Sequence, residues 1–146
     1  MRFTCSVSDI GGALSVVTRA IAARSTIQIL EGVLLTTCPE GLRLTCTDLA
    51  LGIETHIPAE VEKEGSTVLP GKLLAEIVRK LPDERMEISV NAQNVASIRC
   101  AGSRTTLSGL PAEEYPSLPE VGEAKTVSLP ESVLKEMIQR TTFAIA

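Results

Sequence analysis

The residues at the end of the chain begin to repeat the residues at its start. When residues 2–22 are shifted by 124 positions, Phe3 coincides with Val127 and the apolar spacing of the two segments agrees. Each copy has the pattern of a short strand followed by an amphipathic helix, which favours duplication over chance. Because the second copy stops before any element that could cover its helix, we expect a finished domain, the start of a second one, and thus a fragment of a larger protein.

The composition is that of a soluble globular protein. The chain has 146 residues, of which 44% are hydrophobic and 22% are charged, and this is enough to bury one core. No apolar run approaches the roughly 18 residues of a spanning helix, and the start of the chain does not read as a secretory signal. We therefore expect a cytoplasmic protein that does not bind membranes.

The cysteines are far apart, and the sequence has no C-x-x-C pair and only one histidine. Such spacing gives no metal-ligand set, so we expect no metal and no other cofactor. We expect the thiols to be reduced and to lie in the core. The four cysteines are Cys5, Cys38, Cys46 and Cys100.

Charge is distributed unevenly along the chain. The net charge is −4, whereas the expected helices over residues 9–24, 71–80 and 131–140 carry +1, +2 and 0, which leaves −7 for the remainder. Basic helices on an acidic body would suit a protein that turns one face toward a polyanion. Ordinary scatter of surface charge would give the same count.

Apolar spacing predicts the first two helices. The first, residues 9–24, has Ser8 as its expected N-cap and a buried stripe that includes Ile10, Leu14 and Val17. The second, residues 71–80, is preceded by Pro70-Gly71 and stopped by Pro82, and its stripe comprises Leu74, Ile77, Val78 and Leu81.

Alternating and β-branched segments predict the strands. Residues 26–38 and 42–46 form a hairpin through Pro39-Glu40-Gly41. The apolar phase then changes from even to odd positions at Thr47-Asp48, which predicts a β-bulge, and the acidic stretch 60–65 predicts a loop. Further strands are expected at residues 66–69, 86–90, 95–100 and 104–110. Helices segregated over mostly antiparallel sheet define an α+β fold with an internal pseudo-repeat.

Residues 110–120 contain three prolines and three acids and cannot continue a central strand. We expect them to form the exit from the first domain. The predicted division is a first domain at 1–119, a linker at 120–125, and the start of a second, similar domain at 126–146.

The chain offers little that could carry out catalysis. It has no glycine-rich phosphate loop and no metal-binding spacing. A cluster of Cys46, Asp48 and His56 can be drawn, but no oxyanion-type loop accompanies it. We expect a non-enzymatic protein; a small thiol enzyme would require one cysteine to react rapidly with an alkylating agent.

The remaining candidate site is a set of basic residues. They lie on the expected helices, on the sides opposite the apolar stripes. As point charges or forks they could contact phosphates without reading sequence. The chain has one tyrosine, two phenylalanines and no tryptophan, so base stacking and single-strand binding are disfavoured and duplex backbone is the expected target. Solvated helix faces are the simpler alternative. The candidates are Arg19, Arg24, Lys72, Arg79 and Lys80.

Five segments in register resemble the beta sliding clamp family, the processivity subunits of bacterial DNA polymerase III. The resemblance covers the whole chain. The segments are Met1-Arg2-Phe3-Thr4, residues 23–30 (ARSTIQIL), residues 44–49 (LTCTDL), Val68-Leu69-Pro70-Gly71-Lys72 and residues 107–116 (LSGLPAEEYP).

This resemblance implies a ring of six similar domains, three from each of two protomers, with helices lining the hole and sheets outside. Such a ring would hold duplex DNA topologically, without sequence preference, and tether the replicative polymerase. Polymerase and clamp loader would bind through later domains. A fragment ending at residue 146 is therefore expected neither to form the ring nor to support processive synthesis.

The resemblance also implies roles for particular residues. Arg24 matches a DNA-contacting position, and Lys72 and Arg79 match basic positions on the second channel helix; Arg19 and Lys80 are added from helix geometry alone. The edge strand Arg104-Thr105-Thr106-Leu107 matches the seam between protomers, where Arg104 would meet acids and Leu107 would pack.

Two positions depart from the family pattern. Thr105 stands where an aromatic residue is common, and Gly11-Gly12 stands where larger residues are usual. A competing interpretation is a module that self-associates through its sheet edges, with no role in DNA binding.

Overall fold

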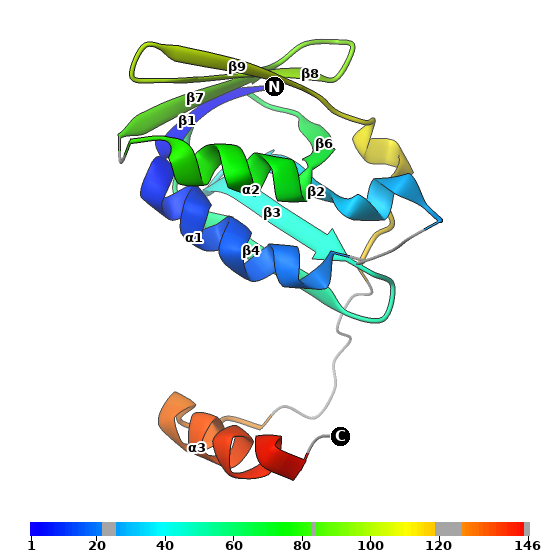
Figure 1. Cartoon of the computed structure of the whole chain (residues 1–146), viewed down its shortest axis with the longest axis vertical. Helices are drawn as coiled ribbons and strands as arrows, with labels where there is room; N and C mark the ends of the chain where they lie inside the picture. The colour runs from blue at the N-terminus through cyan, green and yellow to red at the C-terminus, as the bar shows by residue number, and fades with distance from the viewer. Residues whose placement is uncertain (22–25, 83, 119–126, 145–146) are drawn as a thin grey trace.

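The computed structural model describes residues 1–21, 26–82, 84–118 and 127–144. The described residues up to 118 form one α+β domain, and a further helix follows it (Figure 1). The strands are β1 (Arg2–Ser6), β2 (Gly32–Cys38), β3 (Gly41–Thr47), β4 (Gly52–Ile57), β5 (Glu60–Lys63), β6 (Ser66–Pro70), β7 (Arg85–Val90), β8 (Val95–Cys100) and β9 (Ser103–Ser108). The α-helices are α1 (Val7–Val17), α2 (Gly71–Lys80) and α3 (Glu131–Thr141).

The strands form two antiparallel sheets. Sheet A has the order β5-β1-β7-β8-β9, and sheet B has the order β4-β3-β2-β6. The chain consists of two halves, β1-α1-β2-β3-β4 and β6-α2-β7-β8-β9, and the first strand of each half pairs with the other half's sheet. This exchange of strands joins the two halves and confirms the predicted α+β fold with an internal pseudo-repeat.

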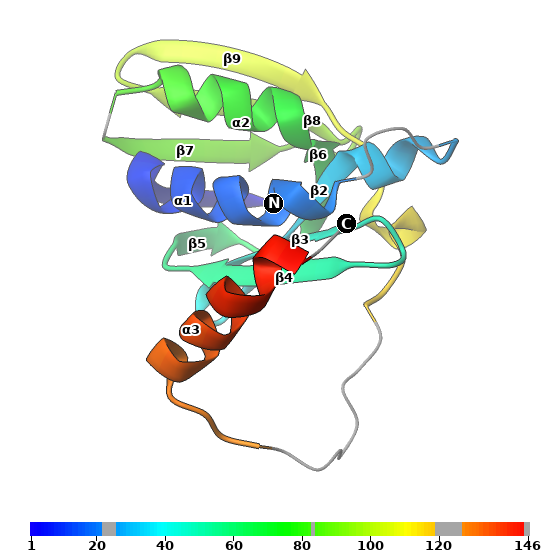
Figure 2. The same cartoon turned by 60° about the horizontal axis from the view of Figure 1, so that its bottom comes forward.

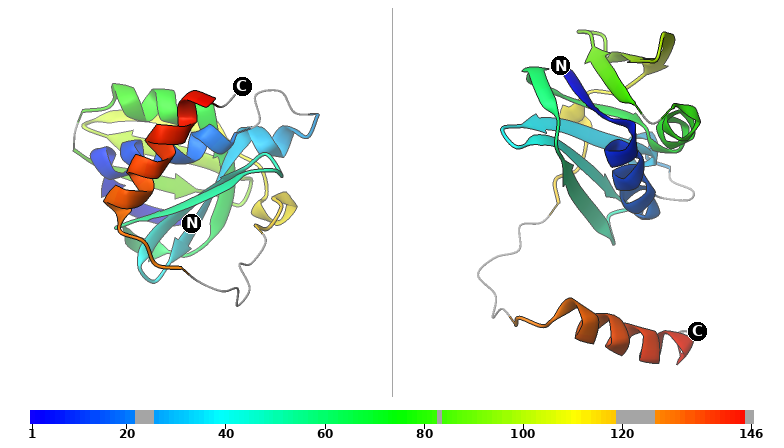
Figure 3. Two further views of the ribbon diagram at one scale, coloured as in Figure 1. Left: turned by 90° about the horizontal axis from the view of Figure 1, so that it is seen from below. Right: turned by 90° about the vertical axis from the view of Figure 1, so that its left-hand side faces the viewer.

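One hydrophobic core fills the space between the sheets and both helices. It includes Phe3 of β1, Leu44 of β3 and Ile88 of β7, which have no exposed surface. Ile10 of α1 and Leu74 of α2 are fully buried as well. The two helices lie side by side on one side of the strands (Figures 2 and 3), so their outer faces form one continuous surface.

Helix α1 differs from the prediction at both ends. It begins at Val7 rather than residue 9, because the Ser6 hydroxyl, not that of Ser8, accepts the Asp9 N–H at 3.4 Å. It ends at Val17 and is followed by a 3-10 turn over Thr18–Ala20. The last residues of the predicted helix, 22–24, lie outside the described part of the chain.

The predicted loop over residues 60–65 was wrong in its first part. Glu60–Lys63 is strand β5, whose Val61 pairs with Phe3 of β1. The charged side chains that suggested a loop are those of an exposed sheet edge, where charges discourage unwanted pairing.

The predicted bulge at Thr47-Asp48 was also wrong. Strand β3 ends at Thr47, which pairs with Gly52, and the residues between them form the turn of the β3–β4 hairpin. Because this turn makes Cys46 pair with Ile53, even positions of β3 face odd positions of β4. The change of apolar phase therefore comes from the length of the turn.

The strand predicted to begin at residue 26 starts only at Gly32, after a 3-10 turn over Gln28–Glu31. The turn is stabilised by packing, since Ile29 and Leu30 form a second small core with Val68 and Tyr115. This core also fixes the exit segment, so residues 110–118 are attached to the domain.

Helix α3 repeats the bounds of α1 at the predicted shift of 124 positions. It covers Glu131–Thr141, and a 3-10 turn over Thr142–Ala144 follows it, as Thr18–Ala20 follows Val7–Val17 at positions 124 lower. None of the described residues of α3 is buried. The expected strand before it is not found in residues 127–130.

Candidate nucleic-acid interface

The outer face of α2 is basic. Lys72, Arg79 and Lys80 are exposed, whereas Leu74 and Val78 of the same helix are buried. This is the orientation that the apolar stripe predicted. Three positive charges and the single acid Glu76 therefore face away from the core.

The neighbouring end of α1 adds one more cation. Arg19 is exposed in the 3-10 turn after α1, while Ala20 beside it is fully buried. The turn that carries Arg19 directly follows α1, the helix that packs beside α2. Arg24 lies outside the described residues.

These helix cations have no acidic partners in the described residues. Arg19, Lys72, Arg79 and Lys80 take part in none of the ion pairs there. Sheet A is different: Arg2 contacts Glu62 at 3.3 Å and Glu87 at 2.9 Å, and Arg85 contacts Glu60 at 2.7 Å. These arginines of β1 and β7 are thus paired with acids, whereas the described cations of the helix face are not.

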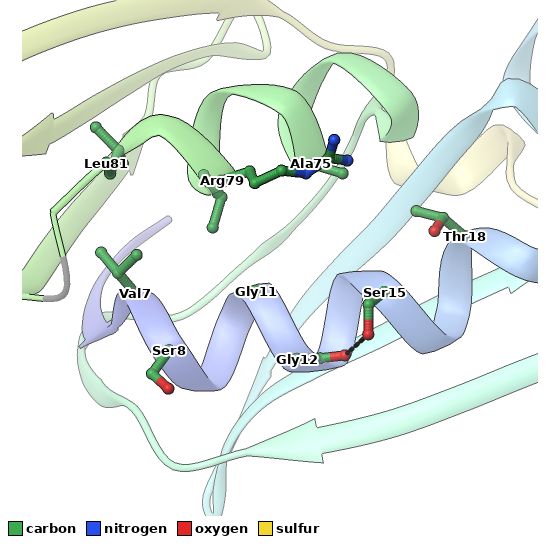
Figure 4. A pocket seen from close by; sticks show the side chains of 10 residues that line it. Val7, Ser8, Gly11, Gly12, Ser15, Thr18, Ala75, Arg79 and Leu81 are labelled. Atoms are coloured by element: carbon green, nitrogen blue, oxygen red, sulfur yellow. Dashed lines mark hydrogen bonds between the residues drawn. The ribbon is translucent and has the colours of Figure 1, made fainter.

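A groove of about 420 Å³ runs between α1 and α2. Arg79 is the one charged residue among those that line it, and its side chain extends along α2 toward Ala75 (Figure 4). We did not predict this groove, because it depends on how closely two helices approach in space. The sequence feature that could have indicated the groove is the pair Gly11-Gly12, which lines it. The lining is Val7, Ser8, Gly11, Gly12, Ser15, Thr18, Ala75, Val78, Arg79 and Leu81.

Strand β9 is a free edge of sheet A in the described structure. Arg104 is exposed on this strand, and its Nε donates to Ser97 Oγ at 3.1 Å. Arg104 also lies directly opposite Arg99 of β8, a like-charge pair that is unfavourable across two strands. Thr105 is half-buried and Leu107 is buried in the domain's own core.

The structure buries Cys46, the thiol of the cluster with Asp48 and His56 that was drawn from the sequence. All four are free thiols; Cys5, Cys46 and Cys100 are buried and Cys38 is half-buried. Burial raises the pKa of Cys46 to about 12, which suppresses the reactive thiolate. In the β3–β4 register His56 pairs with Arg43, whereas Cys46 pairs with Ile53.

No described helix is long and apolar enough to cross a membrane. No group of three or more histidine, cysteine, aspartate or glutamate side chains in that part of the chain is arranged to hold a metal ion.

Comparisons with known proteins agree with the fold and the resemblance. The chain is 41% identical to a beta sliding clamp of Halalkalibacterium halodurans over 138 residues, which cover 89% of this chain and 36% of the relative. The crystal structure of the DNA polymerase sliding clamp from Bacillus subtilis aligns with a TM-score of 0.94 at 34% identity, covering 100% of this chain and 40% of the other.

A DNA polymerase III beta subunit structure from Eubacterium rectale gives a TM-score of 0.93 at 32% identity and the same coverage. The chain therefore spans about two fifths of the length of the relatives that it matches. The family model for the N-terminal domain of the DNA polymerase III beta subunit matches residues 1–119. The chain belongs to the DNA polymerase III beta subunit family.

Proposed function

We propose that this chain supplies the first domain of a sliding clamp, a non-catalytic processivity factor that encircles duplex DNA and tethers the replicative polymerase in the cytoplasm. The observation that carries the proposal is the helix face, where four exposed cations have no acidic partner in the described residues. A polyanion is the natural complement of such a surface.

The DNA contacts in this proposal are made by Arg19, Lys72, Arg79 and Lys80, together with Arg24 of the undescribed segment. Each would meet phosphates rather than bases, which positions a duplex without reading its sequence. Because a closed ring retains DNA by topology, these contacts are weak and salt-sensitive, and this permits sliding.

The ring closes through the free edge of β9, by addition of a strand from a second protomer in a head-to-tail dimer. Arg104 supplies charge on the exposed side of this seam. Thr105 and Leu107 lie on the core side of β9, where they support the apolar side of the added strand.

The proposed division of the chain is a first domain at 1–119, a linker at 120–125 and the start of a second unit at 126–146. Its support is the recurrence of the α1 bounds in α3. Replicative polymerase and clamp loader bind through domains that follow these residues.

The test compares the 146-residue chain with the protein encoded by the whole reading frame that contains it. Both are incubated with nicked circular duplex, a clamp loader and ATP, before and after the circle is cut. The proposal expects the whole protein to stay on circles and to leave cut ends, and the 146-residue chain to do neither. If the whole protein does not distinguish circles from linear DNA under conditions in which a known clamp does, a self-associating module becomes the better interpretation.

A further inference from the structure

The segment by which the chain leaves the first domain crosses sheet B on the face turned away from the main core. At one end, Leu110 pairs with Val68 of β6. At the other end, the side chain of Leu118 lies against Gly52 of β4. Since β6 and β4 are the two edge strands of this sheet, the exit segment spans its whole width.

A groove of about 520 Å³, the sheet B groove, lies beside this segment. Its floor is a row across three strands, in which Thr45 of β3 pairs with Leu34 of β2 and with Glu54 of β4. Residues 116–118 of the exit segment also line it. Because Leu44, next to Thr45, faces the core, the groove opens on the side of the sheet away from α1 and α2.

Arg43 is the residue of this groove with free charged donors. Its Nε lies 3.9 Å from Glu54 Oε2, but its two Nη atoms have no partner in the described residues. The Glu54 carboxylate is already engaged, since Oε2 accepts from the Thr45 hydroxyl at 3.1 Å and Oε1 lies 4.0 Å from His56 Nε2. Arg43 and Glu54 are the charged residues among the described ones that line the groove. An anion that takes the free Nη donors is therefore its complement.

The exit segment adds unpaired backbone groups to the groove. Ser117 is exposed, and in the described part of the chain its N–H and C=O groups make no hydrogen bond. An exposed backbone with unpaired groups is a template for an added strand.

We propose that the sheet B groove docks an extended segment of a partner protein, in which an acidic side chain contacts Arg43 and an apolar side chain lies over Leu34. Because Leu34 pairs with Thr45, Leu34 and Arg43 are diagonal neighbours about 7 Å apart. This separation matches two residues along a strand, whose side chains share one face. The backbone of the segment pairs with Ser117. The inference goes beyond the proposed function, and a partner bound here leaves the helix face free.

Peptide arrays test the groove directly. One array carries short threonine-rich peptides with one leucine and one glutamate two positions apart, in either order, and a second has glutamine in place of glutamate. The labelled 146-residue chain is expected to be retained about tenfold more by the glutamate peptides, as one charge-assisted contact would give. Equal retention on the two arrays, or none on either, would overturn the proposal.

Two arginines provide matched variants for the same arrays. Arg43→Gln and Arg85→Gln each remove a strand arginine that contacts a glutamate, but only Arg43 lines the sheet B groove. Arg43→Gln is expected to abolish the preference for glutamate peptides, and Arg85→Gln to leave it unchanged. Equal effects of the two substitutions would mean that the peptides follow the overall charge of the chain and not the groove.

A third array tests the added strand. Methylation of alternate peptide nitrogens removes every second N–H, and a strand that pairs along one edge uses one alternate set. We expect methylation of one set to abolish retention and methylation of the other to leave it unchanged; equal effects would exclude an added strand. These measurements contain no DNA, so their failure is distinct from a failure of the clamp function.

Discussion

The hydroxyl of Tyr115 accepts the backbone N–H of Thr47 at 3.1 Å and donates to the carbonyl of Gly32 at 3.4 Å. The exit segment is thereby attached to the two central strands of sheet B. Burial raises the pKa of Tyr115 to about 12, so the hydroxyl stays protonated and can donate. This side chain therefore helps to fix the path by which the chain leaves the domain, together with the two backbone hydrogen bonds between Leu110 and Val68.

Replacing the hydroxyl alone tests that attachment. Tyr115→Phe keeps the ring but leaves the buried Thr47 N–H without its partner, which should lower the free energy of unfolding by about 1–3 kcal/mol. Urea denaturation of the 146-residue chain measures the change. Ser103→Ala, at an exposed position, should stay within about 0.5 kcal/mol of the parent; similar losses in both variants would mean that the hydroxyl fixes nothing.

The thiols should react in the order of their exposure. Burial raises the pKa of both Cys5 and Cys46 to about 12, so neither forms much thiolate at neutral pH, whereas Cys38 is half-buried. Mass spectrometry after brief iodoacetamide treatment at pH 7 should show Cys38 modified first. Rapid modification of Cys46 would instead revive the interpretation of the chain as a thiol enzyme.

Asp48 in the β3–β4 turn should make the free energy of unfolding depend on pH in the acidic range. Hydrogen bonds from the N–H groups of Leu51 and Ala50 to the carboxylate hold the pKa of Asp48 below its ordinary value of 3.8. A carboxyl with a lowered folded pKa contributes stability above its unfolded pKa, and this contribution is lost as the pH falls through the folded pKa.

Urea midpoints between pH 7 and pH 2 measure the effect. The parent should lose more stability than Asp48→Asn below about pH 3.8. Parallel curves for the two proteins would show that Asp48 makes no such contribution. Other carboxyls, such as Glu87 beside Arg2, titrate equally in both and cancel.

Charge reversal at the edge of sheet A should weaken the dimer. In the whole protein, Arg104→Glu places an acid where the proposed seam requires a cation, and we expect the dimer Kd to rise about tenfold or more. Sedimentation equilibrium measures it. Arg85→Glu makes the same change on β7, away from the edge, and should leave the Kd unchanged; an equal rise in both would place the seam elsewhere.

Local chemistry made some elements predictable. The bounds of α2 follow from Pro70-Gly71 and Pro82, since a proline can begin a helix and cannot continue one. The exposure of Lys72, Arg79 and Lys80 then follows from the helical period.

Other features depend on neighbours that are distant in the sequence. Ser6 and Ser8 are both good caps, and the pairing of Ser6 with Arg85 at the end of β1 accompanies the earlier start of α1. Val61 joins a sheet because Phe3 lies beside it. The groove at Gly12 exists only because α2 lies against α1, so no pattern within one helix could reveal its shape.

The central claim is that the α1–α2 side of the domain faces DNA and that sheet A faces away from it. A photo-reactive phenylalanine in place of Glu76 on α2, or in place of Glu62 on β5, tests this directly, since both glutamates are exposed. The whole protein is loaded on nicked circular duplex and irradiated. We expect crosslinks to DNA from position 76 and none from position 62; crosslinks from position 62 alone would contradict the claim.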